Sequence, residues 1–348
     1  IPGDAKISIE CQVPNTSKRI DFIITGQTDT HQDCAVIVEL KQWSEATATN
    51  LDGVVKTYVG GAIREVSHPS YQAWSYAALL QGFNSAVEDQ QIKLQACAFL
   101  HNCADPSPLT SPFYAEYLQK APLFAKSDVL RLSEFIKQHV KYGDARNVMY
   151  QIEHGEIRPS KGLADAIAKM IEGNDEFVMI DEQKVVYEQI WNLVEHSSPS
   201  SKNVVIVRGG PGTGKSVVAI QLTARLTAKQ KMVQYVSKNS APRDVYASKL
   251  SGIRTKSWVN NLFKGSGTYI SAERNQYDAL LVDEAHRLNE KSGMFSNLGE
   301  NQIKEIINAA RCSVFFLDED QRVTMKDIGS DAEIAMWAAH AGATLHRL

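Results

Sequence analysis

The sequence predicts an α/β protein of two domains, a small N-terminal sheet with helices and then a parallel sheet covered by helices on both faces. Short β-rich runs separated by polar turns fill residues 7–41, and a helical stretch and another strand-like run follow them. After residue 160, apolar strand-like runs alternate with helical segments, which is typical of a parallel sheet. We therefore expect domains at residues 1–160 and 161–348.

The N-terminal elements follow from hydrophobic periodicity. Residues 7–13, 19–25 and 34–41 read as strands, with the polar loop 26–33 between the last two. Apolar residues at helical spacing predict a helix over 70–87. Further along the chain, 94–100 reads as a strand and 128–139 as helical.

The boundary between the domains is expected in the charged stretch 153–176, which carries Pro159, Gly162 and Gly173. Beyond it, the expected strands are NVVIVRG, KMVQYVS, DALLVDE and SVFFLDE. The chain begins without methionine and stops inside a further strand-like run, ATLHRL, so we expect it to be a piece of a longer protein.

Composition narrows the class of protein but not its fold. Hydrophobic residues make up 43% of the 348 residues and charged residues 22%, as in ordinary soluble proteins. The net charge of -3 means that a nucleic acid would be held by a local basic surface rather than by a global field. Five scattered cysteines, no signal peptide and no long apolar run indicate a cytoplasmic protein without a membrane partner. Cys97, His101 and Cys103 lack the second ligand pair of a zinc site.

A glycine-rich motif, GGPGTGKS, follows an apolar strand and precedes a helix. Its backbone N–H groups can wrap phosphates, Lys215 can reach the β- and γ-phosphates of ATP, and the Ser216 hydroxyl can bind Mg²⁺. The alternative, a chance glycine-rich turn, does not account for the flanking strand and helix. The candidate nucleotide-binding residues are Gly209, Gly210, Pro211, Gly212, Thr213, Gly214, Lys215 and Ser216.

Further candidates end the later strands or precede the motif. Asp283 would hold Mg²⁺ through water, and Glu284 would polarise the water that attacks the γ-phosphate. Gln321 could sense the γ-phosphate, and the Gln183 amide could bind the adenine edge, which favours ATP over GTP. Surface acids, a solvated loop and a surface glutamine are the respective alternatives.

Together these motifs resemble the first RecA-like domain of superfamily 1 helicases, and most of all the Schlafen-related DNA/RNA helicase group of bacteria. The resemblance covers residues 175–348. It implies a second RecA-like domain with an arginine finger beyond the end of this sequence, so this piece alone should bind nucleotide and turn it over weakly. It also makes residues 237–244 and 254–263 candidates for contacting the nucleic-acid strand, with solvated loop and helix as the equal alternative.

Charged residues interrupt two apolar strands of the N-terminal domain. Asp21 lies on one, and Glu39 and Lys41 lie two residues apart on the next, so that these two share a face. Asp21 and Glu39 could converge on a divalent metal, while Lys41 orients or deprotonates the attacking water and stabilises the phosphorane charge. The alternative is an edge strand with a charged outer face.

This arrangement resembles the PD-(D/E)xK nuclease superfamily, although Ile20 stands where the family name has proline. The resemblance implies a restriction-endonuclease-like mixed sheet with flanking helices. Gln72 and Tyr76, one helical turn apart, match the Q-x-x-x-Y helix of RecB-like nucleases, in which the pair faces the active site; an amphipathic helix is the alternative. Glu10 could add a further metal-binding carboxylate.

The sequence thus predicts an ATP-driven helicase or translocase fused to a nuclease that cleaves DNA, with RNA the less favoured substrate. Mg²⁺ is expected in both sites, with Mn²⁺ as an alternative in the nuclease. The resemblance implies a role in bacterial antiviral defence or DNA processing. The competing hypothesis is a nucleic-acid-sensing switch or scaffold that binds ATP and does not cleave. A GTPase or small-molecule kinase has no support in these motifs, and the sequence names no protein partner.

Overall fold

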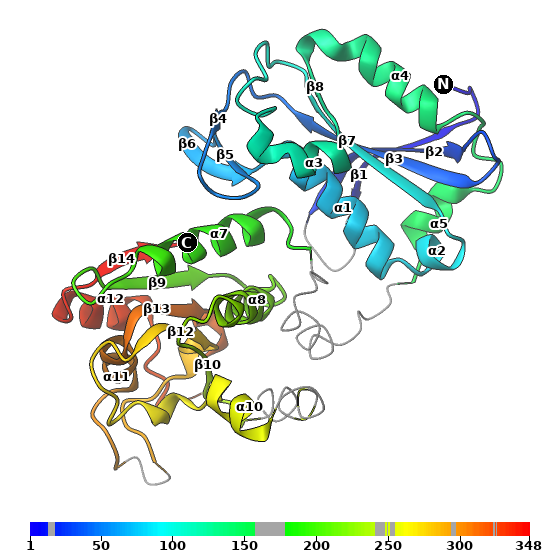
Figure 1. Ribbon diagram of the computed structural model, residues 1–348. Coiled ribbons are helices and arrows are strands. Elements are labelled where there is room, and N and C mark those ends of the chain that lie inside the picture. The colour runs from blue at the N-terminus through cyan, green and yellow to red at the C-terminus, as the bar shows by residue number, and fades with distance from the viewer. Residues whose placement is uncertain are drawn as a thin grey trace. The chain divides into compact units, whose positions relative to one another are not determined.

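The computed structural model describes residues 1–12, 18–156, 178–240, 248, 250, 255–293, 297–322, 324 and 326–348. The chain divides into two compact units, of which Figure 1 shows the elements. The first consists of residues 1–160 together with Val178–Val185, and the second includes Val186–Leu348. The segment Val178–Val185, which we expected in the C-terminal domain, belongs to the first unit because Ile180 packs into its core.

The first unit is built on a mixed five-stranded sheet in the order β1-β2-β3-β7-β8. Strands β1, β2 and β3 pair antiparallel, whereas β7 pairs parallel with both β3 and β8. Parallel neighbours need a crossover connection, and helix α1 (Pro69–Phe83) lies on the one between β3 and β7. The expected fold class is confirmed for this unit. Its strands are β1 (Lys6–Gln12), β2 (Arg19–Gln27), β3 (Asp33–Lys41), β7 (Lys93–Leu100) and β8 (Leu123–Ala125).

Helices cover both faces of this sheet. Helices α1 and α5 pack with alternate apolar residues of β2, β3 and β7, such as Ile23, Ile37 and Ala96. Helix α4 packs against the other face, where Ile136 meets Val36. The remaining helices of the unit are α2 (Ser85–Asp89), η1 (Pro112–Tyr114), α3 (Ala115–Lys120), η2 (Lys126–Asp128), α4 (Val129–His139) and α5 (Val148–His154).

Two details depart from the sequence prediction. A small sheet of β4 (Thr47–Ala48), β5 (Val54–Val59) and β6 (Ala62–Ser67) leads into α1, and its hairpin turns at Gly60 and Gly61, both at positive φ. The helix expected over residues 70–87 is broken at Asn84, whose side chain accepts hydrogen bonds from the Ala86 and Val87 N–H groups in the first turn of α2. An N-cap of this kind ends one helix and starts the next.

The second unit contains a parallel six-stranded sheet in the order β11-β10-β12-β13-β9-β14. The strands expected from the sequence are all present, including the last. Strands β9, β10, β12 and β13 are buried along most of their length, as expected for strands covered on both faces, whereas β14 at the edge is only partly buried. The strands are β9 (Asn203–Arg208), β10 (Val233–Ser237), β11 (Phe263–Lys264), β12 (Tyr277–Asp283), β13 (Ala310–Leu317) and β14 (Thr344–Arg347).

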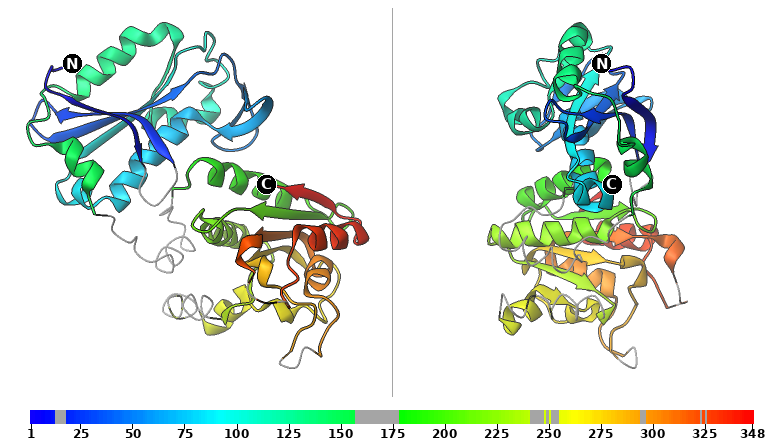
Figure 2. Two further views of the ribbon diagram at one scale, coloured as in Figure 1. Left: turned by 180° about the vertical axis from the view of Figure 1, so that it is seen from behind. Right: turned by 90° about the vertical axis from the view of Figure 1, so that its right-hand side faces the viewer.

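Helices flank this sheet, as the two views of Figure 2 show. Helices α11 and α12 pack on the face that carries Val204, Leu280 and Phe315. Helix α8 packs against β10, β12 and β13. No helix among the described residues has both the length and the apolar character that a membrane crossing requires. The helices are α7 (Asp181–His196), whose first turn is counted with the first unit, α8 (Lys215–Ala228), α10 (Lys256–Leu262), η3 (Ser266–Thr268), η4 (Ala285–Arg287), α11 (Gln302–Ala309), η5 (Glu319–Gln321) and α12 (Asp331–His340).

Candidate functional sites

Asp21 and Glu39 come together in the first unit, on the neighbouring strands β2 and β3. The antiparallel register pairs Phe22 with Val38, and its continuation sets Asp21 opposite Glu39. The backbone N–H of Leu40 donates to Asp21 Oδ2 at 2.8 Å, which holds this half-buried carboxylate at the end of β3. Two carboxylates from adjacent strands therefore lie at one edge of the sheet.

Lys41 joins them. Its ammonium donates to Glu39 Oε1 at 2.7 Å, while Glu39 is only 2% exposed and its other oxygen, Oε2, has no hydrogen-bond partner among the described residues. Burial raises the pKa of Glu39 from 4.5 to about 7, and the charge of Lys41 only partly opposes this rise. The site is thus short of positive charge, and an orphaned carboxylate oxygen beside a second carboxylate fits a divalent cation.

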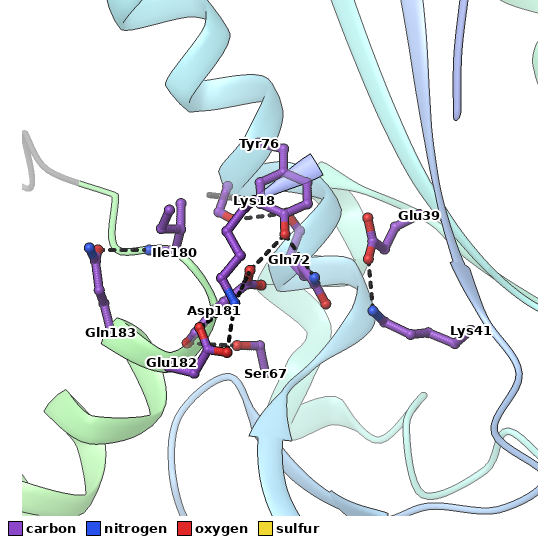
Figure 3. A network of polar contacts seen from close by, with 11 residues as sticks. Lys18, Glu39, Lys41, Ser67, Gln72, Tyr76, Ile180, Asp181, Glu182 and Gln183 are labelled. Carbon is purple, nitrogen blue, oxygen red and sulfur yellow. Dashed lines mark hydrogen bonds and ion pairs between the residues drawn. The ribbon is translucent and has the colours of Figure 1, made fainter. Parts of the chain in front are cut away.

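Gln72 and Tyr76 lie one turn apart on α1, as expected, and are joined by a hydrogen bond. Gln72 Nε2 donates to the Tyr76 hydroxyl at 3.0 Å, and that hydroxyl donates to Asp181 Oδ2 at 2.7 Å (Figure 3). Tyr76 is buried and Gln72 only partly so. Asp181, the first residue of α7, was not predicted as a site residue.

Glu10 is not brought together with the other carboxylates. It lies at the interrupted position of the β1–β2 ladder, opposite Asp21, with a positive φ of 54°. Its exposed carboxylate pairs with Arg19 at 2.7 Å instead. The described part of the chain contains no group of three or more His, Cys, Asp or Glu side chains arranged to hold a metal ion. A three-carboxylate set of Glu10, Asp21 and Glu39 is therefore not formed in this structure.

The glycine-rich motif connects β9 to α8, as its sequence required. Gly212 and Gly214 adopt positive φ values of 74° and 87°, and α8 begins at Lys215. A side chain at Gly209 would collide with the Thr213 hydroxyl, since its Cβ would lie 2.6 Å from that oxygen. The loop Gly210–Thr213 is exposed and leads directly into the N-terminus of α8, a favourable place for phosphate.

The side chains of the motif meet the end of β12. The Ser216 hydroxyl donates to Asp283 Oδ2 at 2.7 Å, and the Tyr235 hydroxyl donates to the same oxygen at 2.5 Å. Lys215 donates to the carbonyl groups of Gly209 and Gly210. A hydroxyl beside a carboxylate at the start of a phosphate-binding helix is a donor set that suits Mg²⁺. Tyr235 was not predicted as a site residue, although it lies on a predicted strand.

Glu284 and Asp318 add two more acids near this motif. Glu284 adopts a positive φ of 51°, and burial, together with the charge of Asp283, raises its pKa. Asp318 is 5% exposed and lies 3.6 Å from the Lys215 ammonium. Asp318 was not predicted, although it directly follows an apolar strand and lies in the same run as Gln321.

The two predicted glutamines lie in different settings. Gln321 is exposed on η5, just after β13, which pairs with β9. Gln183 lies in the first turn of α7, where its Oε1 accepts from the Ile180 N–H at 3.2 Å. The suggested strand-contacting segments lie partly outside the described residues, and α10 carries the described part of the second.

Residues 202–348 match the family model described as Schlafen group 3, DNA/RNA helicase domain. A comparison with curated proteins found none that matches the chain. The matched residues include the glycine-rich motif, Asp283, Glu284 and Gln321, so the second unit is similar to a nucleotide-binding helicase domain. Residues 1–201 lie outside this match.

Proposed function

We propose that the chain is an ATP-dependent helicase or translocase segment joined to a metal-dependent nuclease that cleaves DNA, with RNA as the less favoured substrate. The observation that carries the nuclease assignment is the buried Glu39 carboxylate, paired with Lys41, beside Asp21, and with Oε2 unpartnered among the described residues. A buried, ionised carboxylate with an unpartnered oxygen destabilises the fold unless a cation or a substrate group binds that oxygen.

Asp21 and Glu39 would hold the divalent cation, Mg²⁺ or Mn²⁺, which would supply a Lewis acid to the phosphodiester. Lys41 would stabilise the negative charge that develops on the non-bridging oxygens when water attacks phosphorus. Hydrolysis forms one P–O bond to water, breaks one P–O bond to a sugar, and transfers a proton from the water to the leaving oxygen.

In the second unit, Lys215 and the loop N–H groups would bind the phosphates of ATP, and Ser216 and Asp283 would hold Mg²⁺. Glu284 would orient the attacking water and Gln321 would contact the γ-phosphate. Gln183, which belongs to the first unit, remains a candidate for adenine on the sequence alone. The similarity of residues 202–348 to a DNA/RNA helicase domain supports this assignment and a nucleic-acid substrate.

The second candidate is a nucleic-acid-sensing switch that binds ATP and does not cleave. One observation favours it: Glu10 pairs with Arg19, and the described residues form no metal-binding group of three acids, histidines or cysteines. A role in bacterial antiviral defence rests on the sequence resemblance alone.

The test uses the full-length protein with labelled single- and double-stranded DNA and RNA, Mg²⁺, and ATP present or absent. We expect Lys41→Ala to lower cleavage by ~10²–10³-fold, the usual loss when a group that stabilises the transition state is removed. Lys56→Ala is the matched control, because Lys56 also pairs with a glutamate, Glu65, but outside the site. Lys215→Ala should abolish ATP hydrolysis, and Lys229→Ala, at the exposed end of the same helix, should not. If no nucleic acid is cut while ATP still binds, the sensing switch replaces the nuclease.

A further inference from the structure

Asp181 is a buried carboxylate that none of the motifs above explains. It is 8% exposed and begins α7 with a φ of 41°, a left-handed conformation that a residue other than glycine rarely adopts. Strain of this kind persists only where the surroundings hold the residue firmly, and it is concentrated at functional sites.

The surroundings do hold it. The Ser67 hydroxyl donates to the Asp181 carbonyl oxygen at 2.9 Å, and the Tyr71 hydroxyl donates to the carbonyl of Met179 at 2.6 Å. Ile180 packs in the core formed by α1, α5 and the sheet. Backbone and core together fix Asp181 next to α1, within the first unit.

The Asp181 side chain ends a directed chain of hydrogen bonds. A tyrosine hydroxyl has one proton, and Tyr76 donates it to Asp181 Oδ2 at 2.7 Å. The same hydroxyl therefore accepts the Gln72 amide, at 3.0 Å. Asp181 determines which way the hydroxyl points and, through it, how the Gln72 amide is turned. Gln72 is the more exposed of the pair, so it is the member of the chain that can meet a ligand.

These hydrogen bonds lie beside the candidate site of Asp21, Glu39 and Lys41 in the same unit. Burial, and then the charges of Asp181 and Glu39, raise the pKa of Tyr76, so both carboxylates act on the same hydroxyl. Lys18 lies 3.6 Å from Asp181 and 2.6 Å from Glu182, and it balances part of this negative charge (Figure 3).

We propose that Asp181 is a positioning residue of the candidate nuclease site, which fixes the Tyr76 hydroxyl and thereby orients the Gln72 amide toward the phosphodiester strand. This inference rests on the proposed nuclease function. Asp181 belongs to the first unit, although α7 beyond Val185 belongs to the second.

The test is steady-state cleavage of single-stranded DNA by the full-length protein. We expect Asp181→Ala to lower kcat by ~10–10²-fold, the loss typical of a misplaced group, and to change KM by less than about threefold. Asp181→Asn keeps an oxygen that can accept the Tyr76 proton, so it should restore most of the loss. Glu182→Ala is the matched control, since Glu182 is the neighbouring, exposed carboxylate and also pairs with Lys18. It should stay within about twofold of wild type.

Tyr76→Phe removes the same hydrogen bond from its other end, and it keeps the test valid if Asp181→Ala does not fold. The double variant should be no slower than the slower single variant, because both changes break one interaction. If the wild-type protein cleaves DNA and both Asp181→Ala and Tyr76→Phe cleave at least as fast, this inference is wrong while the proposed function stands. The same holds if the rate losses of the two single variants multiply in the double variant. A folded wild-type protein that cuts nothing overturns the proposed function as well.

Discussion

Replacement of Glu39 by glutamine should make the first unit more stable while it removes cleavage. Glu39 is 2% exposed, and burial raises its pKa from the ordinary 4.5 to about 7. An acid whose pKa is raised in the folded state binds a proton more tightly there than in the unfolded state, so stability falls as pH rises from 4.5 to 7. The ionised form therefore destabilises the fold above that window.

The size of the effect follows from the same pKa difference, which corresponds to ~3 kcal/mol at about 1.4 kcal/mol for each pH unit. We expect Glu39→Gln to be more stable than wild type by about 3 kcal/mol at pH 8 and by less than about 1 kcal/mol at pH 5. Loss of the ion pair opposes this gain only weakly, since the glutamine oxygen can still accept from Lys41, and Lys41, at 15% side-chain exposure, reaches water.

Hydrogen exchange of the β3 amides, measured by mass spectrometry on the full chain between pH 5 and pH 8 in EDTA, reports this free energy locally. Glu116→Gln is the control, because its carboxylate is on the surface at 68% exposure, and the change should stay within about 0.5 kcal/mol. Added Mg²⁺ should stabilise wild type and leave Glu39→Gln unchanged. A variant no more stable than wild type at pH 8, or a difference that does not vary with pH, would refute the account of Glu39.

Two further predictions concern the second unit. Tyr235→Phe removes one of two hydroxyl groups that donate to Asp283. It should lower the kcat of ATP hydrolysis by ~3–10-fold, about the net value of one typical hydrogen bond, in a phosphate-release assay. Tyr269→Phe, which removes a buried tyrosine hydroxyl away from that site, should leave the rate unchanged; equal rates for both variants would contradict the role of Tyr235. Gly329→Ala should slow ATP hydrolysis more than it slows nucleic-acid cleavage measured without ATP. The reason is that the new Cβ would collide with the Ala285 carbonyl, next to Glu284. A normal ATPase rate would show that the backbone around Gly329 can move aside.

The main sheets were predictable because their strands are long and apolar. Runs such as 203–208 and 310–317 are buried along nearly their whole length, so hydrophobicity alone identifies them. The β5–β6 hairpin was not predicted, because both of its strands expose apolar side chains, among them Tyr58 and Ile63. The strands therefore lack the usual alternation of buried apolar and exposed polar residues. Its turn at Gly60 and Gly61 was the readable signal.

Site residues that are close in the sequence could be grouped in advance, and those that are distant in the sequence could not. Asp21, Glu39 and Lys41 could be grouped because strands close in sequence tend to pair, and residues two apart share a face. Asp181 is 105 residues from Tyr76, and no periodicity encodes a contact at that separation. The sequence also could not show that Glu10, though opposite Asp21, would pair with Arg19.

The turn that presents Asp181 also carries Gln183, which closes the turn in both directions: its N–H donates to the Ile180 carbonyl at 2.9 Å, and its Oε1 accepts the Ile180 N–H at 3.2 Å. Gln183→Ala removes the second of these hydrogen bonds, so the Ile180 N–H loses this acceptor and the turn should loosen beside Asp181. Hydrogen exchange in residues 178–185 should then be faster than in wild type. Unchanged exchange in this segment would show that the core packing of Ile180 holds the turn without the glutamine.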